Sequence, residues 1–253
     1  MSYPTLRLHP RKEESVLRFH PWIFSGAIAS FSAPVEDGDL VSVVDSKGRP
    51  LGTGHFGGGS IAVRLLSFDA EEVIDRAFYK RRLEAALRLR ISCDLVRPVG
   101  SSDSPNTTYR LVHGEGDSLP GLIIDIYDCT AVVQAHSLGM HQARQTIAEV
   151  LWEVFAEAGD PVLPLEGVYY KSEATLPTRD MRELASDGFL IGHTEAAPIY
   201  ENGVRFTPDW LKGQKTGFFI DQRDNRALVA HYAKGRTVLN AFCYTGGFSI
   251  YAL

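Results

Sequence analysis

The chain has 253 residues, of which 44% are hydrophobic and 23% are charged, and its formal net charge is −5. This composition is ordinary for a globular protein, and the length allows two or three domains with cores of their own. Three scattered cysteines exclude a disulfide scaffold and a zinc ribbon, and they fit a reducing cytoplasm. No apolar run approaches the roughly 18 residues that span a bilayer, and no H-E-x-x-H pairing suggests a metal.

The negative charge is concentrated in the middle of the chain. Residues 101–204 hold sixteen acidic and five basic side chains, whereas residues 205–253 hold three acidic and seven basic ones. Residues 1–69 are balanced, and residues 70–100 have a small basic excess. Because local basic faces decide nucleic-acid binding more than the overall charge does, both ends of the chain can contact phosphate.

Short apolar runs separated by turn residues fill residues 5–68. Their spacing is typical of a small barrel of short strands. Gly57–Gly59 joins two of these runs and is predicted to be a turn, because a strand rather than a helix follows it. The cluster of His20, Trp22 and Phe24 allows two interpretations, stacking on bases or packing in the barrel core, and the core is favoured for Trp22 and Phe24.

A helix is predicted from about Asp69 to Ser92. Its apolar residues recur at helical spacing: Val73, Ala77, Ala85 and Leu89. Its basic residues either form a solvated face or contact RNA, and the sequence favours neither: Lys80, Arg81, Arg82, Arg88 and Arg90.

A second α+β unit follows. Two strands, 122–126 and 130–135, are predicted to be joined by a turn at Asp128. A helix over about 139–158 ends at Gly159 and presents one apolar face: Ile147, Val150, Leu151 and Val154. Another strand is predicted at 167–171, and a loop near 185–197.

The last part of the chain begins with an Asn202-Gly203 hairpin turn within residues 199–206. Asp221 can cap a helix over roughly 222–233. Residues 237–240 are predicted to form a short buried strand, followed by a glycine-bearing loop and a helix that starts at Phe248. In doubly wound folds this order places loop backbone where nucleotide-like ligands bind.

A charged and aromatic segment lies just upstream, at residues 212–223, which read KGQKTGFFIDQR. The aromatic pair beside Lys215 and Asp221 suits a ligand with an apolar adenine and a zwitterionic amino-acid end. The alternative role for Asp221 is that of a simple helix cap.

The two segments together resemble the class I methyltransferases that make 5-methylcytosine in large-subunit ribosomal RNA. The pattern K-T-G-[FY]-[FY]-x-D-Q-R-x-x-R, here from Lys215, followed by V-L-N-x-F-x-Y-T-G-G-F, here from Val238, is distinctive of that group. Residues 11–15 and 20–27 are similar to the family's opening PUA domain, and residues 109–122 to its central domain.

The resemblance implies a multidomain α/β fold. A PUA-like β-barrel would occupy residues 1–70, and a central α+β domain of the five-element EEHEE type would occupy residues 71–190. Residues 191–253 would form the first part of a Rossmann-like methyltransferase domain, with the chain cut off inside it.

The resemblance also implies residue roles. S-adenosyl-L-methionine would be held from two sides: by Lys215, Phe218, Asp221, Gln222 and Arg223, and by Asn240, Phe242, Tyr244, Thr245, Gly246 and Gly247. The implied substrate is large-subunit ribosomal RNA, methylated at C5 of a cytosine. We expect Arg11, Lys12 and Arg18 to contact its phosphates. The oligomeric state is left open, with a homodimer as one option.

The family's nucleophilic cysteine and its D-P-P motif are expected downstream of Leu253, so the chain by itself is expected to be inactive. Cys93, Cys129 and Cys243 are interpreted as incidental thiols or small apolar fillers. Two other classes stay open. One is a non-enzymatic RNA-binding fragment, and the other is a nicotinamide-dependent oxidoreductase, which the lack of G-x-G-x-x-G at 240–247 disfavours.

Overall fold

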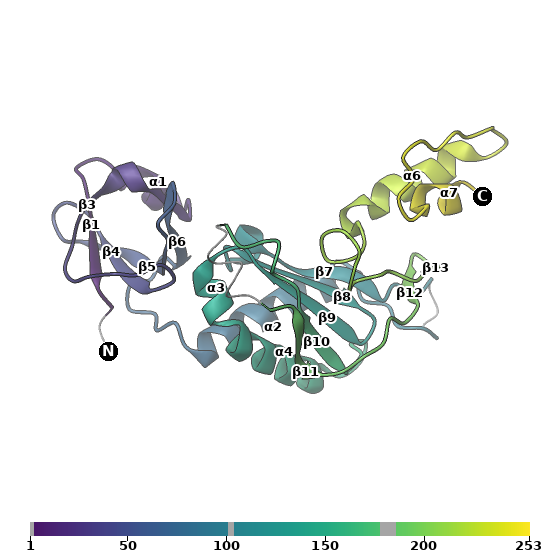
Figure 1. The fold of residues 1–253 in the computed structure, drawn as a ribbon, viewed down its shortest axis with the longest axis horizontal. Helices are drawn as coiled ribbons and strands as arrows, with labels where there is room; N and C mark the ends of the chain where they lie inside the picture. The colour runs from purple at the N-terminus through teal and green to yellow at the C-terminus, as the bar shows by residue number, and fades with distance from the viewer. Residues whose placement is uncertain (1–2, 101–103, 178–185) are drawn as a thin grey trace.

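A computed structural model describes residues 3–100, 104–177 and 186–253. The chain forms three successive parts, an N-terminal barrel-like sheet, a central sheet covered by helices, and a C-terminal arm (Figure 1). No helix of the described residues is both long and apolar enough to cross a membrane. The mixed α/β fold agrees with the class that the sequence predicts.

The N-terminal part is a six-stranded sheet in the order β2-β6-β5-β4-β1-β3, with a short helix α1 (Glu14–Leu17). Its strands are β1 (Thr5–Leu8), β2 (Trp22–Phe24), β3 (Ile28–Phe31), β4 (Leu40–Val44), β5 (Pro50–Phe56) and β6 (Ile61–Ser67). Alternation along β4 buries Val41 and Val43 against Leu6 and Leu8. Glycine is required at position 54, because a Cβ there would lie 2.2 Å from the Arg64 carbonyl oxygen of β6.

The prediction that Trp22 and Phe24 lie in the barrel core is wrong. Ile23 is the buried residue of β2, while its neighbour Phe24 is 52% exposed. The reason is the two-residue period of a strand, which points the residues on both sides of Ile23 outward. Trp22 is only half-buried, and its Nε1–H donates a 2.7 Å hydrogen bond to Glu115 of the central part.

Helix α2 (Arg76–Ser92) begins seven residues later than predicted, where the Asp75 carboxylate accepts a hydrogen bond from the Phe78 N–H. The predicted apolar face is also wrong. Val73 and Leu89 are 61% and 50% exposed, and Ala77 and Ala85 are exposed as well. The helix instead turns another face toward the central sheet and α4: Phe78, Tyr79, Leu83, Ala86, Leu87 and Arg90.

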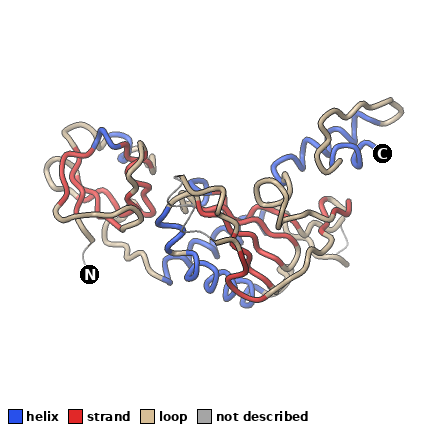
Figure 2. Tube along the Cα trace, in the orientation of Figure 1, coloured by secondary structure: helices blue, strands red, loops and turns tan. Residues whose placement is uncertain are grey.

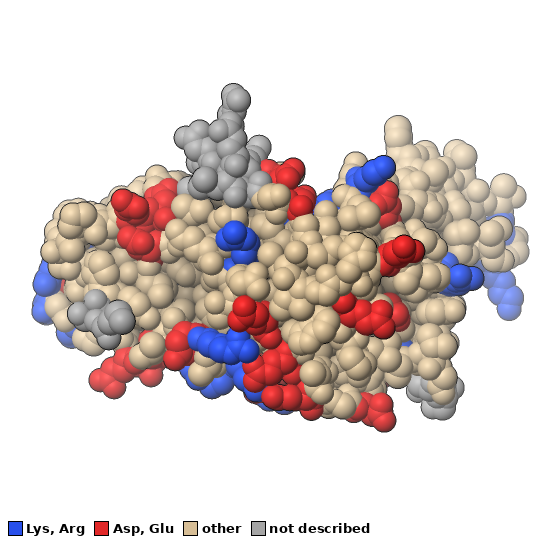
Figure 3. Space-filling model, turned by 60° about the horizontal axis from the view of Figure 1, so that its bottom comes forward, with Lys and Arg blue, Asp and Glu red and all other residues tan. Residues whose placement is uncertain are grey.

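The basic residues of α2 are paired with acidic partners. Lys80 bridges Glu153 and Glu157 of α4 (Arg144–Ala158), at 2.5 and 2.9 Å. Arg90 forms a nearly buried bidentate pair with Asp117. Basic and acidic side chains are interleaved on this face (Figure 3). Of the two alternatives for these cations, the structure favours the solvated, internally paired face over RNA contact.

The central sheet has five strands in the order β11-β10-β9-β8-β7. They are β7 (Thr108–His113), β8 (Leu122–Tyr127), β9 (Thr130–Ala135), β10 (Gly167–Tyr170) and β11 (Gly188–Gly192). β7 adds a strand to the five-element EEHEE order. The loop predicted near 185–197 is wrong, because β11 forms there. β10 offers β11 an antiparallel partner. Residue 185 itself lies outside the described residues. The predicted helix over 139–158 is divided into α3 (Leu138–Gln142) and α4.

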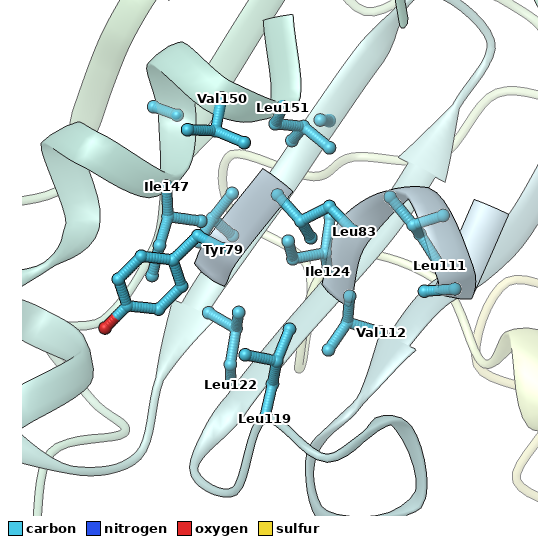
Figure 4. Packing of buried hydrophobic residues seen from close by; sticks show 14 of the residues in the cluster. Tyr79, Leu83, Leu111, Val112, Leu119, Leu122, Ile124, Ile147, Val150 and Leu151 are labelled. Carbon is cyan, nitrogen blue, oxygen red and sulfur yellow. The ribbon is translucent and has the colours of Figure 1, made fainter. Parts of the chain in front are cut away.

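One face of this sheet is covered by α2 and α4 (Figure 2). Figure 4 shows side chains of both helices meeting Leu111, Leu122 and Ile124 of the sheet. The predicted apolar face of α4 is confirmed, because its four residues are all at most 3% exposed. Burying this core is the main driving force for the central fold.

The opposite face of the sheet carries the C-terminal part. Its elements are β12 (Ile199–Glu201), β13 (Val204–Phe206), the 3₁₀ turn η3 (Ile220–Gln222), α6 (Arg223–Ala233) and α7 (Gly247–Ala252). β12 and β13 form the predicted hairpin at Asn202-Gly203. A second core joins them to the sheet: Tyr127, Val132, Tyr169, Ile199, Phe206, Trp210, Phe218 and Ile220.

The buried strand predicted at 237–240 is not formed. These residues have no strand geometry, and Leu239 is 92% exposed. A strand is stable only beside a neighbour that completes its hydrogen bonds. No strand of the described residues lies alongside this segment.

Candidate ligand-binding site

The loop before α6 is held on the central sheet by a buried hydrogen-bond chain. Thr216 Oγ1 lies 2.5 Å from Asp125 Oδ2 and 2.9 Å from Tyr127 Oη. The Phe218 N–H donates to the same tyrosine oxygen at 3.1 Å. Burial raises the pKa of Tyr127, so its hydroxyl stays protonated and can donate to Thr216, which donates to Asp125.

Two further contacts tighten this loop. Lys171 of the sheet donates from Nζ to the carbonyl oxygens of Trp210 and Gly213, at 2.8 and 2.7 Å. Gly217 has φ +129°, and a Cβ there would lie 2.5 Å from Trp210 Cα. Only glycine fits that backbone, so the position of the segment is tightly determined.

A cleft of about 750 Å³ opens between this loop and the segment that precedes α7. Tyr244 closes one side, because its hydroxyl oxygen accepts a 3.2 Å hydrogen bond from the Gln214 N–H. Its ring meets Phe219 edge to face at 5.2 Å. The stretches around 214–222 and 240–248, which are separate in sequence, therefore form the two walls of one cleft.

The cleft carries both signs of charge. Lys215 Nζ lies 3.9 Å from Asp221 Oδ1 and 4.5 Å from the centre of the Phe219 ring. Both charged side chains are about half exposed, at 52% and 50%. A pair this loose and this accessible can exchange partners with a zwitterionic ligand.

Arg226 of α6 forms the floor of the cleft. Its guanidinium pairs with Glu201 of β12, lies 4.5 Å from the centre of the Phe218 ring, and donates to the Phe219 carbonyl oxygen at 3.0 Å. Gly247 is packed against it, since a Cβ there would lie 3.2 Å from Arg226 Cδ. The floor is therefore buried and fixed while the walls are partly exposed.

Most residues predicted to bind the cofactor line this cleft: Lys215, Phe218, Asp221, Gln222, Asn240, Phe242, Tyr244, Thr245 and Gly247. Two do not. Arg223 points into a separate hollow beside Arg90 and Asp117, and Gly246 supplies the left-handed turn, φ +75°, that precedes α7. The alternative role of Asp221 as a helix cap is wrong, because Gln222 occupies the N-cap position of α6 and its side chain makes no capping hydrogen bond with the residues that the structure describes.

Six further lining residues were not among the predicted cofactor-binding residues, although the aromatic pair that includes Phe219 was expected beside the ligand: Gln214, Phe219, Arg226, Ala241, Cys243 and Phe248. Both Phe219 and Arg226 were available from the sequence, because the first motif specifies an aromatic residue at 219 and an arginine at 226. The predicted RNA-contact residues Arg11, Lys12 and Arg18 are exposed on either side of α1, in the barrel-like sheet and away from the cleft.

Two parts of the chain match the models of known domain families. Residues 6–68 match the model of a PUA-like domain, and residues 177–253 match that of an S-adenosylmethionine-dependent methyltransferase. Two solved structures share the fold at a TM-score of 0.77, with 23% and 22% identity, across all of this chain and 60% of theirs. One is a methyltransferase from Streptococcus mutans, and the other is a methyltransferase complexed with SAH.

Curated relatives match nearly the whole chain. The chain is 40% identical over 250 residues to the ribosomal RNA large subunit methyltransferase I of Shewanella amazonensis, and 41% identical over 252 residues to that of Shewanella denitrificans. Each alignment covers 98% of this chain and 59% of the relative. The chain is thus similar to these ribosomal RNA methyltransferases along nearly its whole length and spans 59% of theirs, which confirms the resemblance to that group, while the C5-cytosine target stays a prediction.

Proposed function

We propose that this chain belongs to an RNA methyltransferase that transfers a methyl group from S-adenosyl-L-methionine to a base of large-subunit ribosomal RNA, at C5 of a cytosine. The observation that carries the proposal is the convergence of the two motif segments on one cleft. In this proposal, residues 1–70 bind the RNA, residues 71–190 position the RNA, and residues 191–253 bind the cofactor. A ribosomal RNA substrate places this activity in the cytoplasm.

The residues of the cleft fit the proposed cofactor. The ligand's amino-acid end has a carboxylate and an ammonium group, and Lys215 and Asp221 offer one charge of each opposite sign. Its adenine needs a flat apolar wall, which Phe219 and Tyr244 provide. Asn240 donates from Nδ2 to Ser249 Oγ at 2.8 Å, which orients its amide and leaves Oδ1 as an acceptor.

The chemistry divides between cofactor and protein. The bound cofactor supplies an electrophilic methyl group on a sulfonium. The residues of this chain bind and orient it, and the anchored loop at Thr216 and Gly217 keeps that orientation fixed relative to the central sheet. Arg11, Lys12 and Arg18 are proposed to hold RNA phosphates, since the cations of α2 already have acidic partners.

Calorimetric titration of the 253-residue chain with S-adenosylhomocysteine tests the cofactor site without requiring turnover. We expect binding, and we expect Asp221→Asn to weaken it about tenfold, because a charge-assisted hydrogen bond is lost. Asp224→Asn is the matched control, since Asp224 is 94% exposed and does not line the cleft. The proposal would be overturned if the chain bound NAD⁺ instead of S-adenosylhomocysteine, or if both variants bound S-adenosylhomocysteine equally well.

A further inference from the structure

A second cavity, of about 370 Å³, lies between the barrel-like sheet and the central sheet. Arg64 of β6 lines it from the barrel, and Arg110, Gln134 and His136 line it from the central sheet. Lys215 also lines it, and the same lysine lines the cofactor cleft. The two cavities are therefore neighbours, and all three parts of the chain meet at this place.

Two cations of this cavity are available to a ligand. Arg64 is half-buried, and its only hydrogen-bond acceptor in the described part of the chain is the Ile61 carbonyl oxygen at 3.4 Å. Among the described residues, Lys215 makes a loose contact with Asp221 at 3.9 Å and lies 4.5 Å from the centre of the Phe219 ring. By contrast, Arg110 is committed to a bidentate pair with the buried Asp125, at 2.8 and 2.9 Å.

His136 contributes a neutral group to the same wall. Burial, together with the nearby guanidinium groups of Arg110 and Arg64, lowers the pKa of His136. At neutral pH its imidazole is therefore uncharged and can donate one hydrogen bond. The cavity thus offers two cations and a neutral donor to an anion.

One acidic residue, Glu115, also lines the cavity. Its Oε1 accepts the hydrogen bond from Trp22 Nε1–H, while Oε2 has no donor among the residues that the structure describes. A carboxylate repels any phosphate close to it, but it accepts a hydrogen bond from a sugar hydroxyl. In nucleic acids the 2′-hydroxyl group distinguishes RNA from DNA.

We propose that this cavity binds one nucleotide of the RNA substrate beside the cofactor cleft. Arg64 holds the phosphate of this nucleotide, Lys215 bridges that phosphate and the carboxylate of the cofactor, and Glu115 accepts a hydrogen bond from the 2′-hydroxyl. This inference rests on the proposed function and names a substrate subsite for it. Phosphate contacts position an RNA and hydroxyl contacts select it over DNA, so this site performs both tasks next to the methyl donor.

Fluorescence anisotropy of the full chain with a labelled single-stranded oligoribonucleotide of about ten nucleotides tests the site. Titrations at about 50 to 200 mM salt give the number of phosphates engaged. We expect Arg64→Gln to weaken RNA binding about tenfold and to lower the salt slope by about one. Arg205→Gln is the matched control, because Arg205 is exposed on β13 and lines neither cavity.

A second variant tests the hydroxyl contact. The unmodified chain is expected to prefer the oligoribonucleotide over the same DNA sequence, and Glu115→Gln is expected to reduce that preference. Inorganic phosphate at millimolar concentration should compete with RNA in the unmodified chain but not in Arg64→Gln. Unchanged affinity, slope and RNA preference in both variants would overturn the inference.

Failure of this inference is distinguishable from failure of the proposed function. S-adenosylhomocysteine binding, measured in the same samples, reports the cofactor cleft and confirms that Arg64→Gln is folded. A chain that binds RNA equally well with and without Arg64 contradicts only the subsite. A chain that binds no RNA contradicts the proposed substrate as well.

Discussion

The imidazole of His55 packs directly on the backbone of Gly139, so closely that a Cβ at Gly139 would lie 2.2 Å from His55 Cγ. His55 lies on β5 of the barrel-like sheet, and Gly139 lies in α3 beside the central sheet. The ring is 6% exposed, and its Nδ1 has no hydrogen-bond partner in the described ranges. The junction of the first two parts of the chain thus depends on a neutral, buried histidine.

Stability is expected to fall in mild acid because of this contact. Burial, with a smaller contribution from Arg64, lowers the pKa of His55 from 6.5 to about 4. The folded pKa is below the unfolded one, so the stabilisation is complete above pH 6.5 and decreases as the pH falls toward 4. The slope is up to about 1.4 kcal/mol per pH unit.

Urea unfolding followed between about pH 8 and pH 4.5 measures this slope. His55→Gln should flatten it in that window. His9→Gln, at an exposed position directly after β1, should leave it unchanged. An identical slope in all three proteins would show that His55 is not the group responsible.

Loss of Arg226 is expected to loosen the C-terminal arm. Arg226 and Glu201 are 3% and 0% exposed and lie 2.5 Å apart. Arg226→Met leaves the Glu201 carboxylate buried without a counter-charge, which costs about 3–5 kcal/mol. Hydrogen exchange of the α6 amides measures the local free energy of opening. Arg236→Met, on the exposed surface after α6, should have little effect, and equal exchange in both variants would refute this role.

Removal of the Thr216 hydroxyl is expected to destabilise the loop that bears the cofactor motif. Thr216→Val leaves Asp125 and Tyr127 each short of one buried hydrogen bond, at a cost of about 1–3 kcal/mol. Thr108→Val is an informative control, because Thr108 Oγ1 is also buried but has no partner in the described chain. Chemical denaturation should show a loss for the first variant and none for the second.

Gly217→Ala is expected to displace the same loop. The added methyl group would meet Trp210 Cα at 2.5 Å, on a backbone with φ +129° that alanine disfavours. We expect a loss of about 2–3 kcal/mol in stability and weaker S-adenosylhomocysteine binding. Gly59→Ala, where no atom lies within 4 Å, should match the unmodified chain in thermal unfolding and in calorimetry.

Local chemistry explains what was predictable from the sequence. The Asn202-Gly203 hairpin, the turn at Asp128 and the end of α4 at Gly159 all follow from residues that tolerate unusual backbone angles. The apolar face of α4 was predictable because its apolar residues recur at the regular spacing of a helix. The two motif segments were identifiable because their residues are contiguous in sequence.

Long-range packing decided the rest. The buried face of α2 depends on which surface meets α4 and the sheet, so Phe78 is buried where Val73 and Leu89 had been expected. Strand β11 forms because β10 offers it hydrogen-bond partners, whereas no strand in the described part of the chain lies beside residues 237–240.

By itself, then, the sequence determined the fold class, the family resemblance and most residues of one cleft, because those depend on short contiguous patterns. Only the tertiary structure decided how that cleft is anchored, since Thr216 and Asp125 are 91 positions apart. It also brought Arg64 and Lys215 into one cavity. No periodicity or motif encodes such a meeting, because it arises only when separate parts of the chain bury their surfaces against each other.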